Sequence, residues 1–166
     1  MLLRIGPALV GLILLACGCG DKPPPRPDKR AEAEHSHERG KMLIADAGEH
    51  HAALTAHLSP KGNELDIFFE TADDDPKPVA IPLTRLTAYA RTIGEGEPRE
   101  LTFEPAPADE RPKGEKPGTC SHFVAKAPWM KPEDDLTVVL SLELDGRRTR
   151  VTWSKFIPKK YAHHEE

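Results

Sequence analysis

Aromatic residues are scarce in this chain of 166 residues, where they make up 5% within a hydrophobic fraction of 38%. A basic tract is also lacking, and 23 Lys and Arg against 27 Asp and Glu leave a net charge of −4. This balance disfavours a nucleic-acid-binding protein, because such proteins concentrate cations on one surface. The 17 prolines and 30% charged residues indicate a polar, loop-rich chain with a modest core, near the length of one domain.

The signatures of common catalytic sites are missing as well. The sequence has no G-x-S-x-G, no H-E-x-x-H and no phosphate-binding loop. The run Asp73-Asp74-Asp75 lacks the spacing of a calcium loop and is interpreted as a solvated turn. Cys120 has His122 two residues further on, but a small, partly buried filler explains such a cysteine better than a catalytic thiol does. We therefore predict that the protein is not an enzyme.

A short apolar run lies at the N-terminus. Arg4 precedes the run from Ala8 to Leu15, which falls well below the ~20 residues of a membrane-spanning helix but suits a secretory signal. The run ends in Leu14-Leu15-Ala16-Cys17, which resembles the lipobox of bacterial lipoproteins. This resemblance implies that residues 1–16 are a signal peptide, and that cleavage leaves Cys17 as an N-terminus acylated with palmitate or a similar chain.

The lipobox resemblance implies a location too. A multiply acylated N-terminus holds a protein on a bilayer, since each buried CH₂ contributes about 0.8 kcal/mol, whereas one chain alone holds only marginally. Gly18 follows Cys17, and in better-known lipoproteins the absence of aspartate there favours the outer over the inner membrane. We expect a lipid-anchored protein of the bacterial envelope, facing the periplasm or the surface. Cys19 is the weaker candidate for the lipid, and an ordinary secreted protein is the alternative.

The rest of the chain divides into a spacer, a domain and a tail. Residues 17–46 are predicted to be a disordered tether, because their consecutive prolines favour extended geometry and their charges stay solvated. Residues 47–158 alternate apolar and polar with period two, the pattern of half-buried strands. Residues 159–166 are a polar tail. The segment 105–119 carries four prolines and is predicted to be a long exposed loop.

About seven short strands are predicted in the domain. His50–Leu58 and Glu64–Thr71 are expected to form an antiparallel hairpin. The pair Asp145-Gly146 between two alternating runs predicts a second, tighter hairpin. Short strands without an amphipathic helix favour an all-β fold, namely an immunoglobulin-like antiparallel β-sandwich. A small open barrel is the alternative.

The eight histidines are a surplus for this length, and they cluster. Neutral imidazole is a ligand for copper and zinc. Neighbouring side chains on a strand point to opposite faces, so His50 and His51 do not chelate together. A metal site would therefore combine His35 or His37 with one of these two strand histidines. Histidines that are merely solvated, without a ligand, are the alternative.

Several segments resemble a family of small bacterial envelope proteins. They are His35–Gly40, Ala47–Leu54, Asp66–Phe69, Lys77–Ile81 and Ser121–Val124. Similar segments accompany periplasmic adaptor subunits of heavy-metal efflux pumps, so the resemblance implies a fold and a neighbourhood. We expect an envelope lipoprotein that displays a β-sandwich module for an unknown ligand, with the bilayer and envelope or efflux-pump proteins as partners. The alternative is a copper- or zinc-handling accessory protein of heavy-metal efflux.

Overall fold

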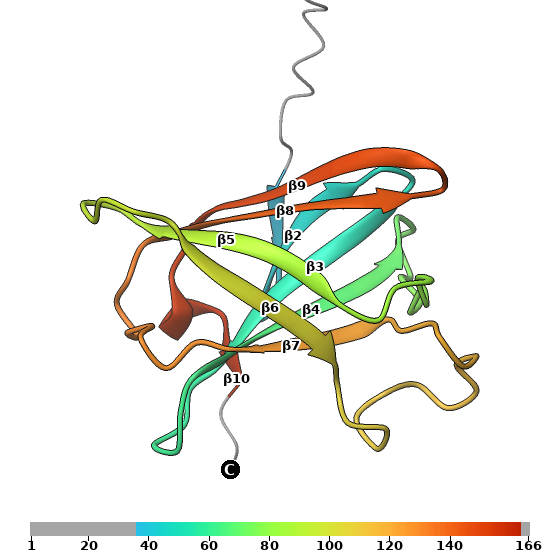
Figure 1. Cartoon of the computed structure of the whole chain (residues 1–166), viewed down its shortest axis with the longest axis horizontal. Coiled ribbons are helices and arrows are strands. Elements are labelled where there is room, and N and C mark those ends of the chain that lie inside the picture. The colour runs from blue at the N-terminus through green and yellow to red at the C-terminus, as the bar shows by residue number, and fades with distance from the viewer. Residues whose placement is uncertain (1–35, 164–166) are drawn as a thin grey trace, which may run out of the picture. The chain divides into compact units, whose positions relative to one another are not determined.

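The computed structural model of the protein describes residues 36–163, which form strands joined by turns and loops (Figure 1). The strands are β1 (Ser36–Arg39), β2 (Met42–Ala47), β3 (His50–His57), β4 (Glu64–Thr71), β5 (Leu86–Thr92), β6 (Arg99–Pro105), β7 (His122–Lys126), β8 (Leu136–Leu144), β9 (Arg147–Phe156) and β10 (Ala162–His163), with one 3-10 turn at Pro158–Lys160. Within this range no helix is long and apolar enough to cross a membrane. The expected lipid site Cys17, its alternative Cys19 and the expected ligand His35 lie outside the described residues.

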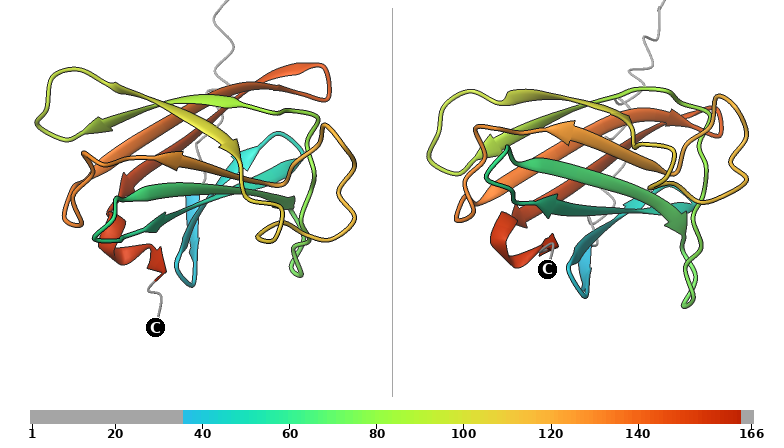
Figure 2. Two further views of the ribbon diagram at one scale, coloured as in Figure 1. Left: turned by 60° about the horizontal axis from the view of Figure 1, so that its bottom comes forward. Right: turned by 90° about the horizontal axis from the view of Figure 1, so that it is seen from below.

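The strands join into one hydrogen-bonded sheet. Their order is β1-β2-β3-β4-β7-β6-β5-β8-β9, and neighbours along this path are antiparallel. The short β10 pairs in parallel with the end of β3, at Ala56 and His57, beyond the stretch of β3 that pairs with β2. Figure 2 shows from two sides how the sheet curls rather than lying flat.

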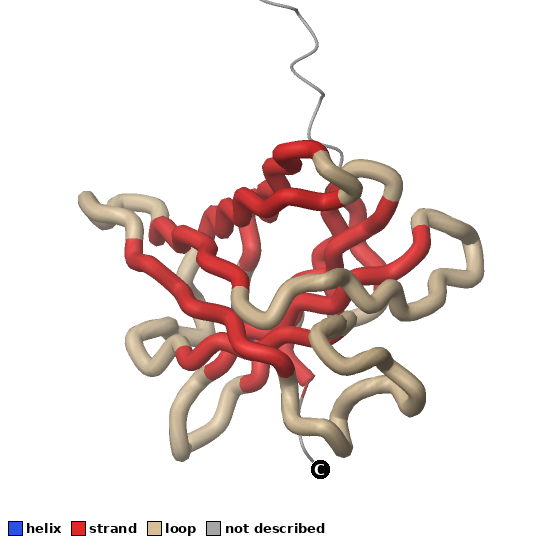
Figure 3. The backbone as a smooth tube through the Cα atoms, turned by 45° about the vertical axis from the view of Figure 1, so that its right-hand side comes forward, coloured by secondary structure: helices blue, strands red, loops and turns tan. Residues whose placement is uncertain are grey.

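The curl brings β9, at one end of the path, next to β2, the second strand from the other end. β9 lies beside β2 without a strand ladder between them, and the indole Nε1 of Trp153 donates a hydrogen bond of 3.0 Å to the carbonyl of Ala52 on β3. Figure 3 shows the strands arranged around a common interior. The largest fully buried side chains of this interior are Trp153, Phe69, Phe103, Phe123, Phe156, Leu54, Leu65, Ile67, Leu101, Met130 and Leu136.

Local sequence explains the clearest hairpin. Every second residue of β8, from Leu136 to Leu144, is buried, as the period-two pattern predicts. Asp145 and Gly146 have φ values of 51° and 72°, the left-handed pair that a two-residue turn between twisted strands requires. One extra residue on β9 then forms a β-bulge opposite the start of β8, where Lys155 has a φ of 57°.

The all-β class and both expected hairpins are confirmed. The finer expectation, an immunoglobulin-like sandwich of about seven strands, is not confirmed, because the described strands form one continuous curled sheet of ten. The curl is closer to the alternative of a small open barrel. The loop expected at 105–119 lies at 106–121, where it connects β6 to β7, because Pro105 still belongs to β6 and β7 begins only at His122.

Both ends of the domain lie outside the expected boundaries of 47 and 158. β1 and β2 fall in the segment assigned to the tether, and β10 falls in the expected tail. The β2 segment gave no alternating signal because Leu43 and Ala45 face the core while Ile44, on the opposite face, is also fully buried. At the other end Tyr161 is 2% exposed and belongs to the core.

Candidate functional site

One face of the sheet has a chemistry of its own. We use the term outer face for the side of β2, β3, β4 and β7 that points away from the core. The register places Asp66, Phe68 and Glu70 of β4 on this face, with Phe68 opposite His122 of β7. Two of these polar residues, Glu70 and His122, are buried at 8% and 6% exposure. Because outward polar residues of a half-buried sheet are normally solvated, their burial indicates that other segments cover this face.

The His122 imidazole is fixed on three sides. Its Nε2 lies 2.9 Å from Oδ1 of Asp66, and its ring stacks on Phe68 with centroids 4.1 Å apart. Its Nδ1 lies 3.4 Å from the carbonyl oxygen of Glu110 in the loop that follows β6. The histidine therefore ties β4, β7 and this loop together.

Glu70 is a buried carboxylate that is only half satisfied. Its Oε2 accepts a hydrogen bond of 2.5 Å from Arg39, which reaches from β1 across to β4. The Glu70 side chain is 10% exposed, and its Oε1 has no hydrogen-bond partner within the described residues. A buried carboxylate oxygen without a donor carries a desolvation cost of about 1–3 kcal/mol or more. The position is therefore unfavourable for the fold alone.

The loop 106–121 is anchored over the same face. The carboxylate of Glu115 accepts hydrogen bonds from the backbone N–H of Ser121 at 2.9 Å and from its hydroxyl at 2.5 Å. Arg111 NH1 lies 3.5 Å from the other oxygen of Glu115. The Nε of Arg111 is buried and has no partner in the described part of the chain. The loop is thus positioned by side chains and not simply solvated.

Between this loop and the sheet lies a pocket of about 390 Å³, which we call the outer-face pocket. Its apolar lining includes Met42, Phe68, Pro76, Pro78 and Pro112. Its polar lining comprises Glu70, Asp109, Glu110, Arg111, Ser121 and His122. Apolar walls with a few convergent polar groups are typical of small-molecule sites.

The segment that supplies Pro76 and Pro78 is itself held in place. Val79 donates its backbone N–H to the carbonyl of Phe69 at 2.8 Å, and Thr71 donates to Lys77 at 2.9 Å. Further along, the segment forms an isolated bridge between Ile81 and Cys120. This segment, which forms one wall of the pocket, is therefore hydrogen-bonded to the end of β4 and to Cys120, shortly before β7 begins.

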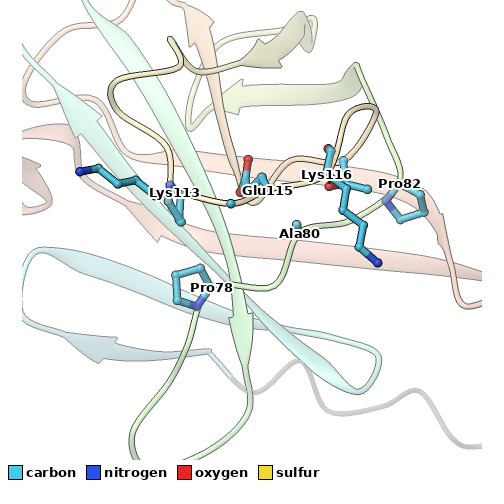
Figure 4. Close-up of a pocket in the computed structure, with 9 residues that line it drawn as sticks. Pro78, Ala80, Pro82, Lys113, Glu115 and Lys116 are labelled. Carbon is cyan, nitrogen blue, oxygen red and sulfur yellow. The ribbon is translucent and has the colours of Figure 1, made fainter.

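A second pocket, of about 510 Å³, adjoins the first one and shares Pro78 and Pro112 with it (Figure 4). It lies between residues 78–82 and 112–119, and most of its lining is exposed. In Figure 4 the side chains of Lys113 and Lys116 extend away from one another. Its one acidic group, Glu115, is already engaged by Ser121. This pocket therefore offers a ligand less than the outer-face pocket does.

The structure brings together two of the histidines that the sequence singled out. His37 of β1 and His51 of β3 lie edge to face, with ring centroids 5.2 Å apart. The Nε2 of His51 lies 3.6 Å from Oδ1 of Asp46. His50 points to the opposite side, where its Nε2 lies 3.6 Å from Oδ2 of Asp145 in the β8–β9 turn. Among residues 36–163 no group of three or more His, Cys, Asp or Glu has the arrangement of a metal site.

β1, which carries His37, is held from its other face. Glu38 accepts hydrogen bonds from Lys160 and, at 2.9 Å, from the hydroxyl of Tyr161. These hydrogen bonds lower the pKa of Glu38, and the one that Lys160 donates to Glu38 raises the pKa of the lysine. A lowered carboxyl pKa means that the contact is fully present above the ordinary value and is lost as the pH falls through the lowered value. Protonation of Glu38 therefore weakens the side-chain contact between β1 and Lys160.

The sequence missed the polar residues that matter most for the pocket. Glu70 is recognisable from the sequence as outward-facing but not as buried, and Arg111 lies in a loop without a motif. Cys120, expected to be a small, partly buried filler, is fully buried at 1% exposure, and its thiol contacts the backbone carbonyl of His122 at 2.8 Å. In comparisons with known proteins, no protein family, no curated protein and no solved structure matches this chain.

Proposed function

We propose that the protein is a lipid-anchored envelope protein that displays its β-domain as a binding module for a small ligand. The observation that carries the binding role is the outer-face pocket, where apolar walls surround a buried carboxylate with one unpartnered oxygen. The anchor rests on the resemblance of Leu14-Leu15-Ala16-Cys17 to a lipobox, and Gly18 favours the outer membrane. In this proposal the module binds its ligand at the envelope surface and performs no catalysis.

The binding role is tested by a screen in which the position of binding is observed. The whole protein, purified in a nonionic detergent, is mixed with small organic compounds of positive, negative and zero charge. We expect the backbone resonances that respond to binding compounds to cluster around Phe68, Glu70, Arg111 and His122. A screen that leaves these resonances unperturbed, or that shifts them only along with the whole domain, would contradict the proposal.

A second candidate function is metal handling, with copper or zinc as the ion and efflux-pump proteins as partners. The observation in its favour is the approach of His37 to His51, with Asp46 next to His51. Imidazole suits zinc and divalent copper, so this pair would supply two ligands of a site that the described residues do not complete. His35, two residues before His37 in the sequence, is the further expected ligand.

Replacing His37 and His51 together with alanine is expected to abolish copper or zinc binding, because it removes both imidazoles of the pair. In the wild-type protein the affinity is expected to fall on acidification, since protons compete with the metal for the imidazole nitrogens. Calorimetric titration of the whole protein measures both effects.

His50→Ala is the matched control for this pair, because His50 lies on the opposite side of β3 and should not change the affinity. A separate His35→Ala variant tests the remaining expected ligand. Equal metal affinity in the wild type and the double variant would remove metal handling at this position.

A further inference from the structure

We propose that the outer-face pocket selects a small organic cation, an ammonium group attached to an apolar body. This inference rests on the proposed binding function and specifies its ligand. It is carried by Glu70, the one acidic lining residue that is buried, and by the charges that surround it.

The two oxygens of Glu70 differ in what they contact. Oε2 accepts a hydrogen bond from Arg39, so the ion pair of Arg39 and Glu70 is locally neutral. Oε1, in contrast, is buried without a donor in the described part of the chain. An N–H donor entering the pocket would remove the desolvation cost of this oxygen. A charged donor gives the stronger hydrogen bond, because a bond between an ammonium and a carboxylate is about twice as strong as a neutral one.

The remaining charges favour a cation over an anion. The charge of Arg111 is opposed by Glu115, although its buried Nε has no partner within the described residues, and the His122 imidazole is held by Asp66, so neither side chain is free of an acidic neighbour. Asp109 and Glu110 also line the pocket, and they form no ion pair within residues 36–163. The pocket thus has a surplus of negative charge. An anion would meet this surplus, whereas a cation is attracted by it.

The rest of the lining determines the body of the ligand. Met42, Phe68 and Pro76 are partly exposed apolar residues of the wall. Burying an apolar group against them contributes roughly 25 cal/mol per Å² of area removed from water. The volume of about 390 Å³ lies in the range of small-ligand sites, which suits one aromatic ring or a short alkyl chain next to the ammonium group.

Three compounds of nearly the same shape test the charge preference: phenethylammonium, neutral 2-phenylethanol and anionic 3-phenylpropanoate. Each is titrated into the whole protein in a nonionic detergent, with the detergent alone as a blank, and the pocket resonances are followed. We expect phenethylammonium to bind about tenfold more tightly than either analogue, the effect of one charge-assisted hydrogen bond. Glu70→Gln should reduce the affinity for the cation to the level of the affinity for the alcohol. The affinity for the alcohol should be nearly the same in the variant and in the wild type.

Glu97→Gln is the matched control, because it removes the same charge from the exposed turn between β5 and β6, which contributes nothing to the pocket lining. A second variant, Asp109→Asn with Glu110→Gln, alters only exposed side chains and keeps the test open if Glu70→Gln fails to fold. It should weaken cation binding severalfold and flatten its dependence on salt.

The outcomes separate the ligand class from the binding function. Equal affinity for the cation and the alcohol, or tighter binding of the anion, would overturn the cation proposal. The proposed binding function would survive either result, because the pocket would still bind a ligand. Failure of all three compounds would also overturn it. The binding function itself would fall only if the broad screen also left the pocket unperturbed.

Discussion

Replacing Cys17 with serine is expected to abolish fatty-acid attachment to the protein. The lipobox resemblance makes the Cys17 sulfur the point of thioether formation, and a hydroxyl in its place does not form that bond. Without acyl chains the anchor loses about 0.8 kcal/mol for every CH₂ that would be buried in the bilayer. The measurement is incorporation of labelled palmitate during expression in bacteria, together with the mass of the N-terminal peptide.

The control is Cys19→Ser, which should keep both the label and an N-terminus at Cys17. Sedimentation with membranes is the weaker readout, because the serine variant is expected to keep residues 1–16, whose apolar run also binds lipid. A wild-type protein that carries no label, or a label that survives in Cys17→Ser and disappears in Cys19→Ser, would refute the assignment of Cys17.

The sequence predicts those parts of the fold in which a strand has one buried face and one solvent-exposed face. β8 is an example, because every second residue from Leu136 to Leu144 is buried while the residues between them are partly or fully exposed. The turn at Asp145-Gly146 is another, since its two left-handed residues leave few alternatives. In both cases the signal is local, so no knowledge of the rest of the fold is needed.

The parts that could not be predicted depend on contacts between segments far apart in the chain. β2 is buried on both faces at Leu43, Ile44 and Ala45, so these residues show no alternation. Glu70 looks like an ordinary outward residue of β4, and only the approach of Arg39 and of the loop after β6 turns it into a buried carboxylate. The meeting of His37 and His51 likewise depends on β1 pairing with β2, in a segment whose prolines and charges predicted a tether.

Replacing Trp153 with alanine is expected to cost about 3–5 kcal/mol of the free energy of unfolding, the usual range for deleting a buried aromatic side chain. Trp153 is fully buried, and it also bridges the curl by donating to Ala52 on β3. Because small domains have a total stability of only about 5–15 kcal/mol, the melting temperature should fall by on the order of 10 °C or more. Urea unfolding and thermal melts followed by circular dichroism measure both quantities.

Trp153→Phe separates packing from hydrogen bonding, because it keeps most of the apolar volume and removes the N–H donor. We expect it to cost less than the alanine variant but still about 1–3 kcal/mol, since the Ala52 carbonyl loses its donor in a buried place. Trp129→Ala is the control, because Trp129 is only partly buried and packs at the edge of the core, with the Arg99 guanidinium 4.9 Å from its ring. A loss for Trp153→Ala no larger than that for Trp129→Ala would mean that the ends of the curled sheet are not held together through this tryptophan.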